Sequence, residues 1–464
     1  MDYISTRGRA ATLNFKGAML AGLASDGGLY VPAHIPQLSH ADIAALRGLS
    51  YVETAVRIMQ PFVAGSMDAD MLRTLCTAAY GNFAHSAVAP LVQLDHRHWV
   101  LELFHGPTLA FKDIALQLLG QMFEHALSGT QTKLTIVGAT SGDTGSAAID
   151  AVAGRAAVEI FMLHPHGRIS DVQRRHRTTV LAPNVHNIAI EGSFDDAQAF
   201  VKRMFTDPVI AEPLTLSAVN SINWARLMAQ IVYYFYAAVR LGAPERPVAF
   251  SVPTGNFGDV FAGYVAARMG LPVARLMVAT NVNDILHRAL SHGDYSAGDV
   301  AATATPSMDI QVSSNFERLL FDLAGRDGAA LSAMMTKFDT QRNLKLPPDM
   351  LASAQALFSS ARIDGDRMAR ALRSARDSAD MLIDPHTAIG LAAAQDADLP
   401  ADIPIVTLAT AHPAKFRDAV ERATGVRPHL PARLGDLFAR AEAMQILPAE
   451  YATVRDHILA HAAR

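Results

Sequence analysis

The chain has 464 residues, of which 50% are hydrophobic and 18% charged, and its formal net charge is −4. This composition is typical of a folded protein of two or three domains, and the slight acidic excess speaks against a nucleic-acid-binding protein. The single cysteine, Cys76, can form neither an internal disulfide nor a cysteine-based metal site, so we expect the reducing cytoplasm.

Residues 1–90 are rich in alanine and leucine in helix-compatible order, which predicts a mostly helical N-terminal domain. The small apolar run 17–24 follows basic residues, as in a signal peptide, but it is too short and too weakly apolar for one. A buried helix that ends at the turn 25–28 fits better. The longest apolar stretch, 227–239, is shorter than the ~20 residues of a membrane helix, so we expect no membrane segment.

Between residues 91 and 425, short apolar runs alternate with helix-period segments such as 111–127 and 221–239. This order predicts an α/β catalytic region of two subdomains, with parallel sheets covered by helices. Residues 307–375 are expected to be helical and poor in strands, and residues 426–464 to form closing helices. The expected strands are 99–103, 134–137, 158–163, 185–190, 248–252, 275–279 and 403–408.

Ligands of such sheets bind beyond the carboxyl ends of the strands, and the first strand-to-helix loop of interest is 104–113, Phe-His-Gly-Pro-Thr-Leu-Ala-Phe-Lys-Asp. Thr108 is placed to start a helix, and Lys112 falls in its first turn. The helix dipole and burial would both lower the pKa of this amine, as a lysine nucleophile requires. A lysine that reaches solvent and pairs with Asp113 explains these residues equally well.

Two further loops carry the pattern of anion sites. Residues 138–147, Gly-Ala-Thr-Ser-Gly-Asp-Thr-Gly-Ser-Ala, offer three glycines and four hydroxyls at a helix start, although a plain tight turn is the alternative. Residues 253–259, Pro-Thr-Gly-Asn-Phe-Gly-Asp, place two glycines around Asn256, so that backbone amides can approach a phosphate. The loop 138–147 matches neither the dinucleotide nor the P-loop fingerprint. Two anion loops on one sheet suggest one ligand with two anionic ends, or a cofactor phosphate and a separate substrate anion.

Other features favour structural roles. The pairs His96/His98 and His164/His166 lack the spacing and carboxylates of a metal site, so we expect no metal. The basic run 174–177 is either a solvated helix face or a rim that attracts an anionic substrate. The aromatic run 233–236 is expected to lie in the core.

A lysine at a helix start, a phosphate loop and a hydroxyl-rich anion loop together describe a pyridoxal phosphate enzyme. At this point the sequence resembles the threonine synthase family, of fold-type II pyridoxal-phosphate enzymes similar to the tryptophan synthase β subunit. The family's motifs run in order through about nine-tenths of the chain. They stand at residues 3–8, 26–32, 104–113, 139–147, 253–259, 307–310, 314–318 and 410–416.

The resemblance implies a role for each motif residue. Lys112 would form the Schiff base with pyridoxal 5'-phosphate and then move protons on the substrate, and Thr410 would hydrogen-bond the pyridine nitrogen. The cofactor phosphate would be cradled by Gly255, Asn256, Phe257, Gly258 and Asp259. The substrate carboxylate would be held by Ser141, Gly142, Asp143 and Thr144. Candidates for the substrate phosphate are Arg174, Asn220, Asn223 and Arg226.

Many fold-type II relatives carry asparagine where this chain has Asp143. A carboxylate accepts hydrogen bonds but cannot donate one to the cofactor's ring oxygen, so that contact is in question.

The implied reaction converts O-phospho-L-homoserine and water to L-threonine and phosphate, the last step of threonine biosynthesis. Its nearest rival is a threonine-synthase-like phospholyase, which releases a keto acid, ammonia and phosphate. A non-catalytic binder with this fold would not need the intact Phe111-Lys112-Asp113 and both anion loops, and a nicotinamide dehydrogenase would need a fingerprint that is missing. The small-molecule substrate is the only partner implied, and the sequence does not distinguish a monomer from a homodimer.

Overall fold

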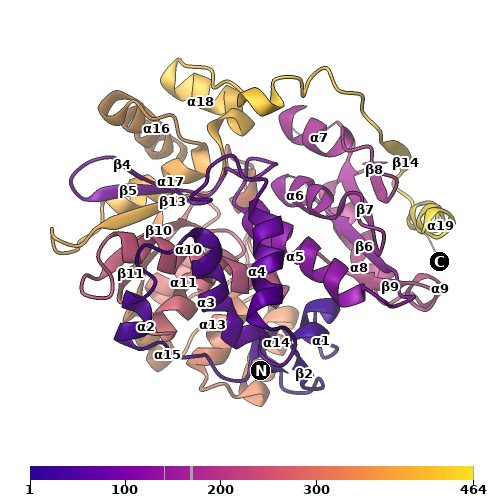
Figure 1. Cartoon of the computed structure of the whole chain (residues 1–464), viewed down its shortest axis with the longest axis horizontal. Helices are drawn as coiled ribbons and strands as arrows, with labels where there is room; N and C mark the ends of the chain where they lie inside the picture. The colour runs from indigo at the N-terminus through magenta and orange to yellow at the C-terminus, as the bar shows by residue number, and fades with distance from the viewer. Residues whose placement is uncertain (141, 168–170, 463–464) are drawn as a thin grey trace.

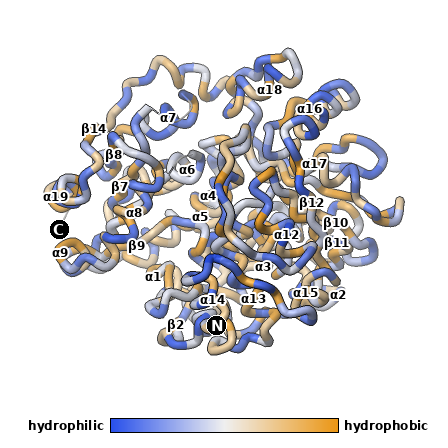
Figure 2. The backbone as a smooth tube through the Cα atoms, turned by 180° about the vertical axis from the view of Figure 1, so that it is seen from behind, coloured by the Kyte–Doolittle hydropathy of each residue, from blue (hydrophilic) through white to orange (hydrophobic). Residues whose placement is uncertain are grey.

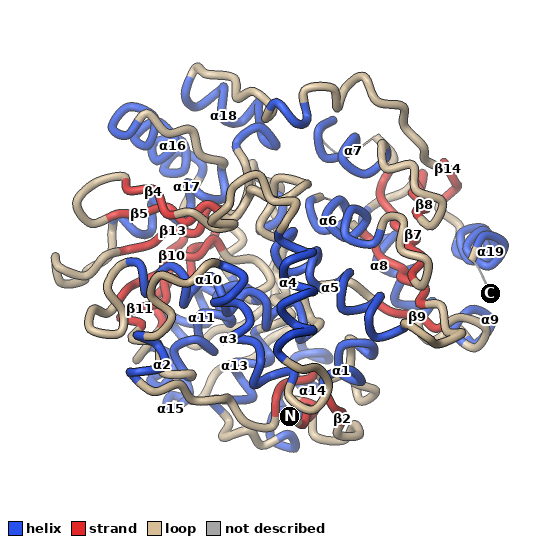
Figure 3. Tube along the Cα trace, in the orientation of Figure 1, coloured by secondary structure: helices blue, strands red, loops and turns tan. Residues whose placement is uncertain are grey.

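The computed structural model describes residues 1–140, 142–167 and 171–462. Its strands form three sheets, and the two larger ones stand side by side with helix α5, Lys112–Leu127, between them (Figures 1 and 3). The α/β class with parallel sheets is therefore as predicted. No helix in the described part of the chain is long and apolar enough to cross a membrane.

The six-stranded sheet has the order β12-β11-β10-β13-β5-β4 and is parallel except for β4. Its inner strands are continuous apolar runs because both faces are covered by helices; every residue of β10 and β13 is buried. The strands are β4 Leu91–Gln93, β5 His98–Glu102, β10 Val248–Pro253, β11 Val273–Thr280, β12 Phe358–Arg362 and β13 Ile405–Ala409.

The five-stranded sheet has the order β14-β8-β7-β6-β9 and is parallel throughout. Its central strand, β7, is buried along its whole length. The strands are β6 Leu134–Ala139, β7 Val158–Pro165, β8 Val185–Glu191, β9 Thr215–Ser217 and β14 Gln445–Pro448.

The N-terminal region contains a small antiparallel sheet that the sequence did not predict. Strand β1, Asp2–Ser5, pairs with β2, Leu13–Asn14, and with β3, Tyr30–Pro32. These strands have two to four residues, too few for an alternating pattern to be recognised. Helices still make up most of the regular structure in residues 1–90.

Two further differences concern the C-terminal half. Strand β12 interrupts the segment expected to be strand-poor, and β14 lies within residues 426–464, where only closing helices were expected. Both are edge strands of four or five residues with exposed positions, so they lack the apolar run by which the inner strands are recognised. The division of the chain at residues 90 and 425 stays a prediction.

Helices cover the sheets on both faces, and the outer helix α16 carries hydrophilic stretches (Figure 2). The helices are α1 Phe15–Ala21, α2 His40–Ala44, α3 Tyr51–Val63, α4 Ala69–Tyr80, α5 as above, α6 Asp143–Val152, α7 Asp171–Thr178, α8 Phe194–Met204, α9 Pro208–Ala211, α10 Trp224–Arg240, α11 Gly258–Arg268, α12 Ile285–His292, α13 Phe316–Leu323, α14 Gly328–Gln341, α15 Pro348–Gln355, α16 Gly365–Ala379, α17 Pro385–Gln395, α18 Arg417–Thr424 and α19 Tyr451–His461.

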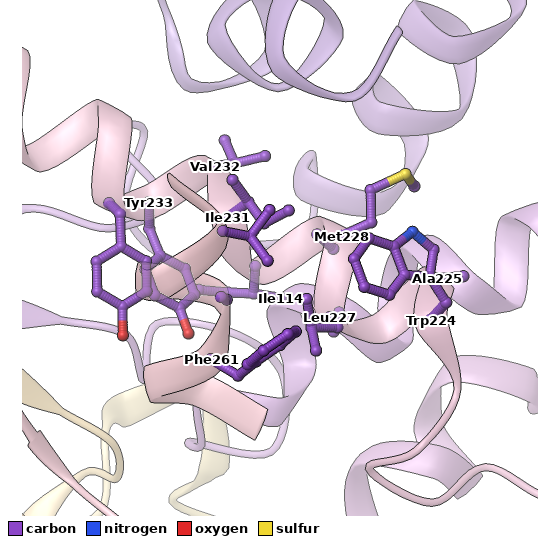
Figure 4. Close-up of a cluster of buried hydrophobic side chains, with 14 of the residues drawn as sticks. Ile114, Trp224, Ala225, Leu227, Met228, Ile231, Val232, Tyr233 and Phe261 are labelled. Carbon is purple, nitrogen blue, oxygen red and sulfur yellow. The ribbon is translucent and has the colours of Figure 1, made fainter. Parts of the chain in front are cut away.

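Helix α10 is the centre of the main core. It is buried from Trp224 to Val239, and it packs against α3 of the N-terminal region as well as α5 and α11. The first 90 residues therefore share one core with the catalytic region. Figure 4 shows side chains of α10 together with Ile114 of α5 and Phe261 of α11.

Candidate active site

The loop before α5 is shaped by a buried hydrogen-bonded pair. Thr108 donates from its backbone N–H (2.8 Å) and its hydroxyl (2.6 Å) to the carboxylate of Asp113. Gly106 is required where the loop passes this carboxylate, because a Cβ there would lie 2.3 Å from the Cβ of Asp113. The loop thus delivers Lys112 to the first turn of α5, as predicted. The prediction that Thr108 starts this helix is wrong, because α5 begins at Lys112 with Phe111 as its N-cap, and Thr108 instead binds Asp113.

The side chain of Lys112 is only 13% exposed, and it does not reach solvent to pair with its neighbour. Burial lowers the pKa of Lys112; Asp143 raises it, and the cations Lys415 and Arg226 lower it again. The carboxylate of Asp113 accepts hydrogen bonds from Thr108 instead, and burial raises the pKa of Asp113 to about 7. Of the two interpretations of this loop, the structure favours the buried amine with a lowered pKa.

The nearest carboxylate to Lys112 belongs to the other sheet. Asp143, the first residue of α6, places Oδ2 3.9 Å from Nζ of Lys112. Its Oδ1 accepts from Lys415 at 2.7 Å and from Gln173 at 3.0 Å. Because Lys112 follows β5 and Asp143 follows β6, this contact joins the carboxyl ends of the two sheets, where a ligand is expected to bind.

Residues 255–259, which follow β10, form what we call the cofactor loop. Phe257 adopts a left-handed conformation (φ 62°) directly before α11. In the described part of the chain, the N–H groups of Asn256, Phe257 and Gly258 have no acceptor. A Cβ at Gly255 would lie 2.6 Å from the carbonyl oxygen of Ser307. The loop therefore offers free N–H groups at a helix start, as a phosphate site requires.

Neighbouring segments hold the cofactor loop from behind. The hydroxyl of Ser313 donates to the backbone carbonyl of Gly255 at 2.8 Å. The side-chain amide of Asn315 donates to the backbone carbonyl of Asn256 at 3.0 Å. Arg318 binds Asn315 in turn and donates to the carbonyl of Tyr30 at 2.9 Å. Two of the quoted motifs, 26–32 and 314–318, thus support the loop structurally.

The carboxylate of Asp259 points into the core rather than toward a ligand. Its Oδ1 accepts from the hydroxyls of Tyr233 and Tyr234, the latter at 3.1 Å. Burial raises the pKa of Asp259 to about 6. The aromatic run 233–236 is thus in the core as predicted, and it also anchors the cofactor loop, which the sequence did not indicate.

Residues 141–144 at the start of α6 are what we call the substrate loop; Ser141 lies outside the described residues. The hydroxyl of Thr140 accepts from the N–H groups of Gly142 (3.2 Å) and Gly145 (3.1 Å). The N–H groups of Asp143 and Thr144 have no acceptor among the residues described. This helix start is therefore also able to bind an anion. The expectation that both anion loops lie on one sheet is wrong, because the substrate loop follows β6 of the five-stranded sheet and the cofactor loop follows β10 of the six-stranded sheet.

Thr410 follows β13 and lies beside the start of α5. Its carbonyl accepts from the N–H of Phe111 at 2.9 Å, and the adjacent Ala411 forms a bridge with Ala110. The residue is 7% exposed. The structure thus brings Thr410 next to Lys112, as a contact to the ring of a shared cofactor would need.

The basic residues of α7 lie in two different surroundings, one at the C-terminal segment and one in the protein interior. Arg174 forms ion pairs with Glu442 and with Asp171 (3.4 Å), which ties it to the C-terminal segment. Arg177 is fully buried, and all three nitrogens of its guanidinium group lack a hydrogen-bond partner in the described structure. Burial lowers its pKa to about 10, and nearby Asp143 opposes that shift. Arg177 belongs to the basic run that was considered as a rim for an anionic substrate, but it was not among the four candidates for the substrate phosphate. Its unpaired nitrogens make it a better candidate than Arg174.

The other three predicted candidates for the substrate phosphate also differ in whether they lie near Lys112. Arg226 is buried on α10, where it donates to the carbonyl of Val219 at 3.0 Å and lowers the pKa of Lys112. Asn223 is buried as the N-cap of α10 and also donates to the carbonyl of Met19 at 2.8 Å. Asn220 is exposed, and its side chain accepts from Ile222. Arg226 therefore lies close to Lys112, whereas the side chains of Asn220 and Asn223 are bound to neighbouring backbone groups and have structural roles.

Comparisons with known proteins agree with this geometry. Residues 2–80 match the family model "Threonine synthase N terminus", residues 85–337 match "Pyridoxal-phosphate dependent enzyme", and residues 387–458 match "Threonine synthase, C-terminal". A threonine synthase from Pseudomonas aeruginosa is 54% identical over 100% of this chain and 99% of its own length. One from Saccharomyces cerevisiae is 42% identical over 91% and 88% of the two chains.

Solved structures of threonine synthases are similar to this chain as well. The crystal structure of a PLP-bound threonine synthase from Brucella melitensis has a TM-score of 0.97 and 51% identity, and covers 100% of both chains. That of threonine synthase from yeast has a TM-score of 0.94 and 38% identity, covering 99% of this chain and 98% of its own. The chain belongs to the threonine synthase family of pyridoxal-phosphate-dependent enzymes.

Proposed function

We propose that this chain converts O-phospho-L-homoserine and water to L-threonine and phosphate, with pyridoxal phosphate bound through Lys112. The observation that carries the proposal is the position of Lys112, a buried amine with a lowered pKa close to a carboxylate of the substrate loop. The reaction is the last step of threonine biosynthesis. Since the single cysteine is buried and free, we also propose a cytoplasmic enzyme with no need for disulfides.

The residues fit the cofactor. The free N–H groups of the cofactor loop would bind its phosphate, and the crowding at Gly255 leaves no room for a side chain there. When bound, pyridoxal phosphate supplies an electron sink that stabilises negative charge on the substrate carbon bonded to the amino nitrogen. Thr410 would donate or accept one hydrogen bond at the ring nitrogen, and its neutral hydroxyl would leave that nitrogen less basic than a carboxylate would.

Lys112 would be the base of the reaction. Its Nζ would take a proton from the substrate's alpha carbon and then move protons at the neighbouring carbon. A neutral amine is needed for this, and burial favours the neutral form of Lys112.

Two groups of donors would orient the substrate. The substrate loop would bind the carboxylate through the N–H groups of Asp143 and Thr144, with Gly142 beside them. Ser141, which the resemblance also implies as a ligand of the carboxylate, lies outside the described residues. The phosphate would lie against Arg177 and Arg226, because both are buried cations with nitrogens that have no partner in the described structure. Arg174 is less suitable because Glu442 already neutralises it.

The test is to incubate the enzyme with O-phospho-L-homoserine in oxygen-18 water and to compare the products with the phosphate released. Threonine with the heavy atom on its beta hydroxyl, in amounts equal to the phosphate, is the expected result. The purified Lys112→Ala variant serves as the control for contaminating activity. If 2-oxobutyrate and ammonia account for most of the phosphate, the enzyme is a phospholyase and the proposal fails.

A further inference from the structure

Lys415 is a buried cation for which the reaction described above has no use. It is 1% exposed, and it is one of only seven lysines in the chain. Its Nζ donates to the carbonyl of Thr108 and to Oδ1 of Asp143, each at 2.7 Å. Lys415 thus connects the loop that carries Lys112 with the substrate loop on the other sheet.

Asp143 divides its two oxygens between two lysines. Oδ1 makes a short charge-assisted hydrogen bond to Lys415, whereas Oδ2 lies 3.9 Å from Lys112, beyond hydrogen-bond distance. The side chain of Gln173 donates to Oδ1 as well, at 3.0 Å. The carboxylate is therefore committed to Lys415 and only adjacent to Lys112.

This division of contacts matters for the charge of Lys112. A carboxylate alone beside a buried lysine stabilises the ammonium form, which can neither attack a carbonyl group nor accept a proton. A second ammonium on the same carboxylate balances its charge and adds a repulsion of its own. The charged groups close to Lys112 are Asp143 of α6, Lys415 after β13, Arg226 of α10, Asp113 of α5 and Asp259 of α11.

We propose that Lys415 is a positioning residue that neutralises Asp143, so that this carboxylate can stand beside Lys112 without fixing a proton on it. The inference rests on the proposed function, because only a reactive Lys112 needs a neutral amine. It also explains how a carboxylate is tolerated in the substrate loop. The buried Lys415–Asp143 pair has no net charge, and the third hydrogen of the Lys415 ammonium group is left as a donor.

The test measures the charge of Lys112 in the full chain without cofactor. The rate at which an amine-reactive acylating reagent modifies the Lys112 peptide is followed by mass spectrometry as a function of pH. The exposed Lys133 in the same digest serves as the internal standard. The midpoint of the profile reports the charge of Lys112, and the plateau at high pH reports its accessibility to the reagent.

Three variants separate the proposal from simple structural damage. Lys415→Met keeps the length of the side chain, and it should raise the midpoint so that labelling near neutral pH slows at least about tenfold. Asp143→Asn should shift the midpoint the other way. The double variant restores the balance of charge. Its labelling rate near neutral pH should therefore return to within about threefold of the wild-type rate.

The proposal is overturned if Lys415→Met leaves the labelling rate of Lys112 within about threefold of the wild type, or if the double variant behaves like Lys415→Met alone. Should Lys415→Met not fold, Asp143→Asn decides, because an unchanged midpoint there also overturns the proposal. Labelling requires no turnover, so a wild type that makes no threonine would contradict the proposed function and leave this result standing.

Discussion

The cofactor loop and the substrate loop are both helix starts with free N–H groups, yet their surroundings differ. Around the cofactor loop, Ser313 and Asn315 bind the carbonyls, and two tyrosines bind Asp259. Beside the substrate loop, Arg177 has three buried nitrogens without a partner in the described structure. A ligand that stays bound can be held by a loop whose carbonyl groups are already bound by neighbouring side chains. A ligand that leaves in each cycle has to supply contacts of its own.

The largest expected effect comes from the amine that lies close to both loops. Lys112→Ala should lower the rate of threonine formation by at least about 10⁴-fold, because it removes both the covalent attachment and the base. Borohydride reduction of the wild type should fix the cofactor to the peptide that contains Lys112, as peptide mapping can show. A label on Lys133 or Lys415 would contradict the assignment.

A side chain in the cofactor loop should cost cofactor affinity before stability. Gly255→Val places atoms against the carbonyl of Ser307, so the free N–H groups are displaced and the cofactor Kd should rise at least about 100-fold. The cofactor-free protein should lose only about 1–3 kcal/mol of unfolding free energy. Gly365→Val, at a position with open space, is the matched control. Equal losses of affinity and stability would mean that the loop is merely a turn.

Beside the substrate loop, two arginines three residues apart should differ in their effects. Arg177→Met should lower kcat/KM by about 10²-fold or more, since it removes a buried charged donor for the substrate, whereas cofactor affinity should hardly change. Arg174→Met, which breaks an ion pair with Glu442, should stay within about tenfold of the wild type. Steady-state kinetics with both variants checks this order, and the reverse order would return the assignment to Arg174.

The last expected effect concerns neither turnover nor binding but stability, which should depend on pH at the anchor of the cofactor loop. Asp259 has a folded pKa of about 6 against an ordinary value of 3.8, so folding favours its protonated form. Relative to Asp259→Asn, the wild type should lose up to roughly 3 kcal/mol of unfolding free energy as the pH rises from about 4 to about 6, and no more above that. Denaturant titrations of both proteins at several pH values measure the difference. A difference independent of pH would show that Asp259 is ionised without penalty.

The sequence predicted those parts of the site that depend on local order. Lys112 and the two loops each stand between an apolar strand and a helix, so their place at the strand ends follows from the pattern alone. Lys415 and Arg177 could not be found in this way. Their roles depend on contacts with Thr108 and Asp143, which are distant in sequence, and on which side of a short helix is buried.

The fold shows the same limit. Inner strands such as β7 and β10 are continuous apolar runs and were predicted, with small differences at their ends. The strands that were missed are short, lie at or next to a sheet edge, or belong to the small N-terminal sheet. They form because a neighbouring strand offers free hydrogen-bonding groups, and that neighbour is not visible in a local window of sequence.

The position of β13 has a consequence for the synthesis of the protein. This strand lies between β10 and β5, although it follows both in the chain. Until the ribosome has released residue 409, β10 and β5 each keep an unpaired edge toward the gap, and neither Thr410 nor Lys415 exists to complete the site. Such bare edges can pair with other chains. The nascent chain is therefore open to mispairing at these edges until β13 emerges, when nearly nine-tenths of the chain has been made.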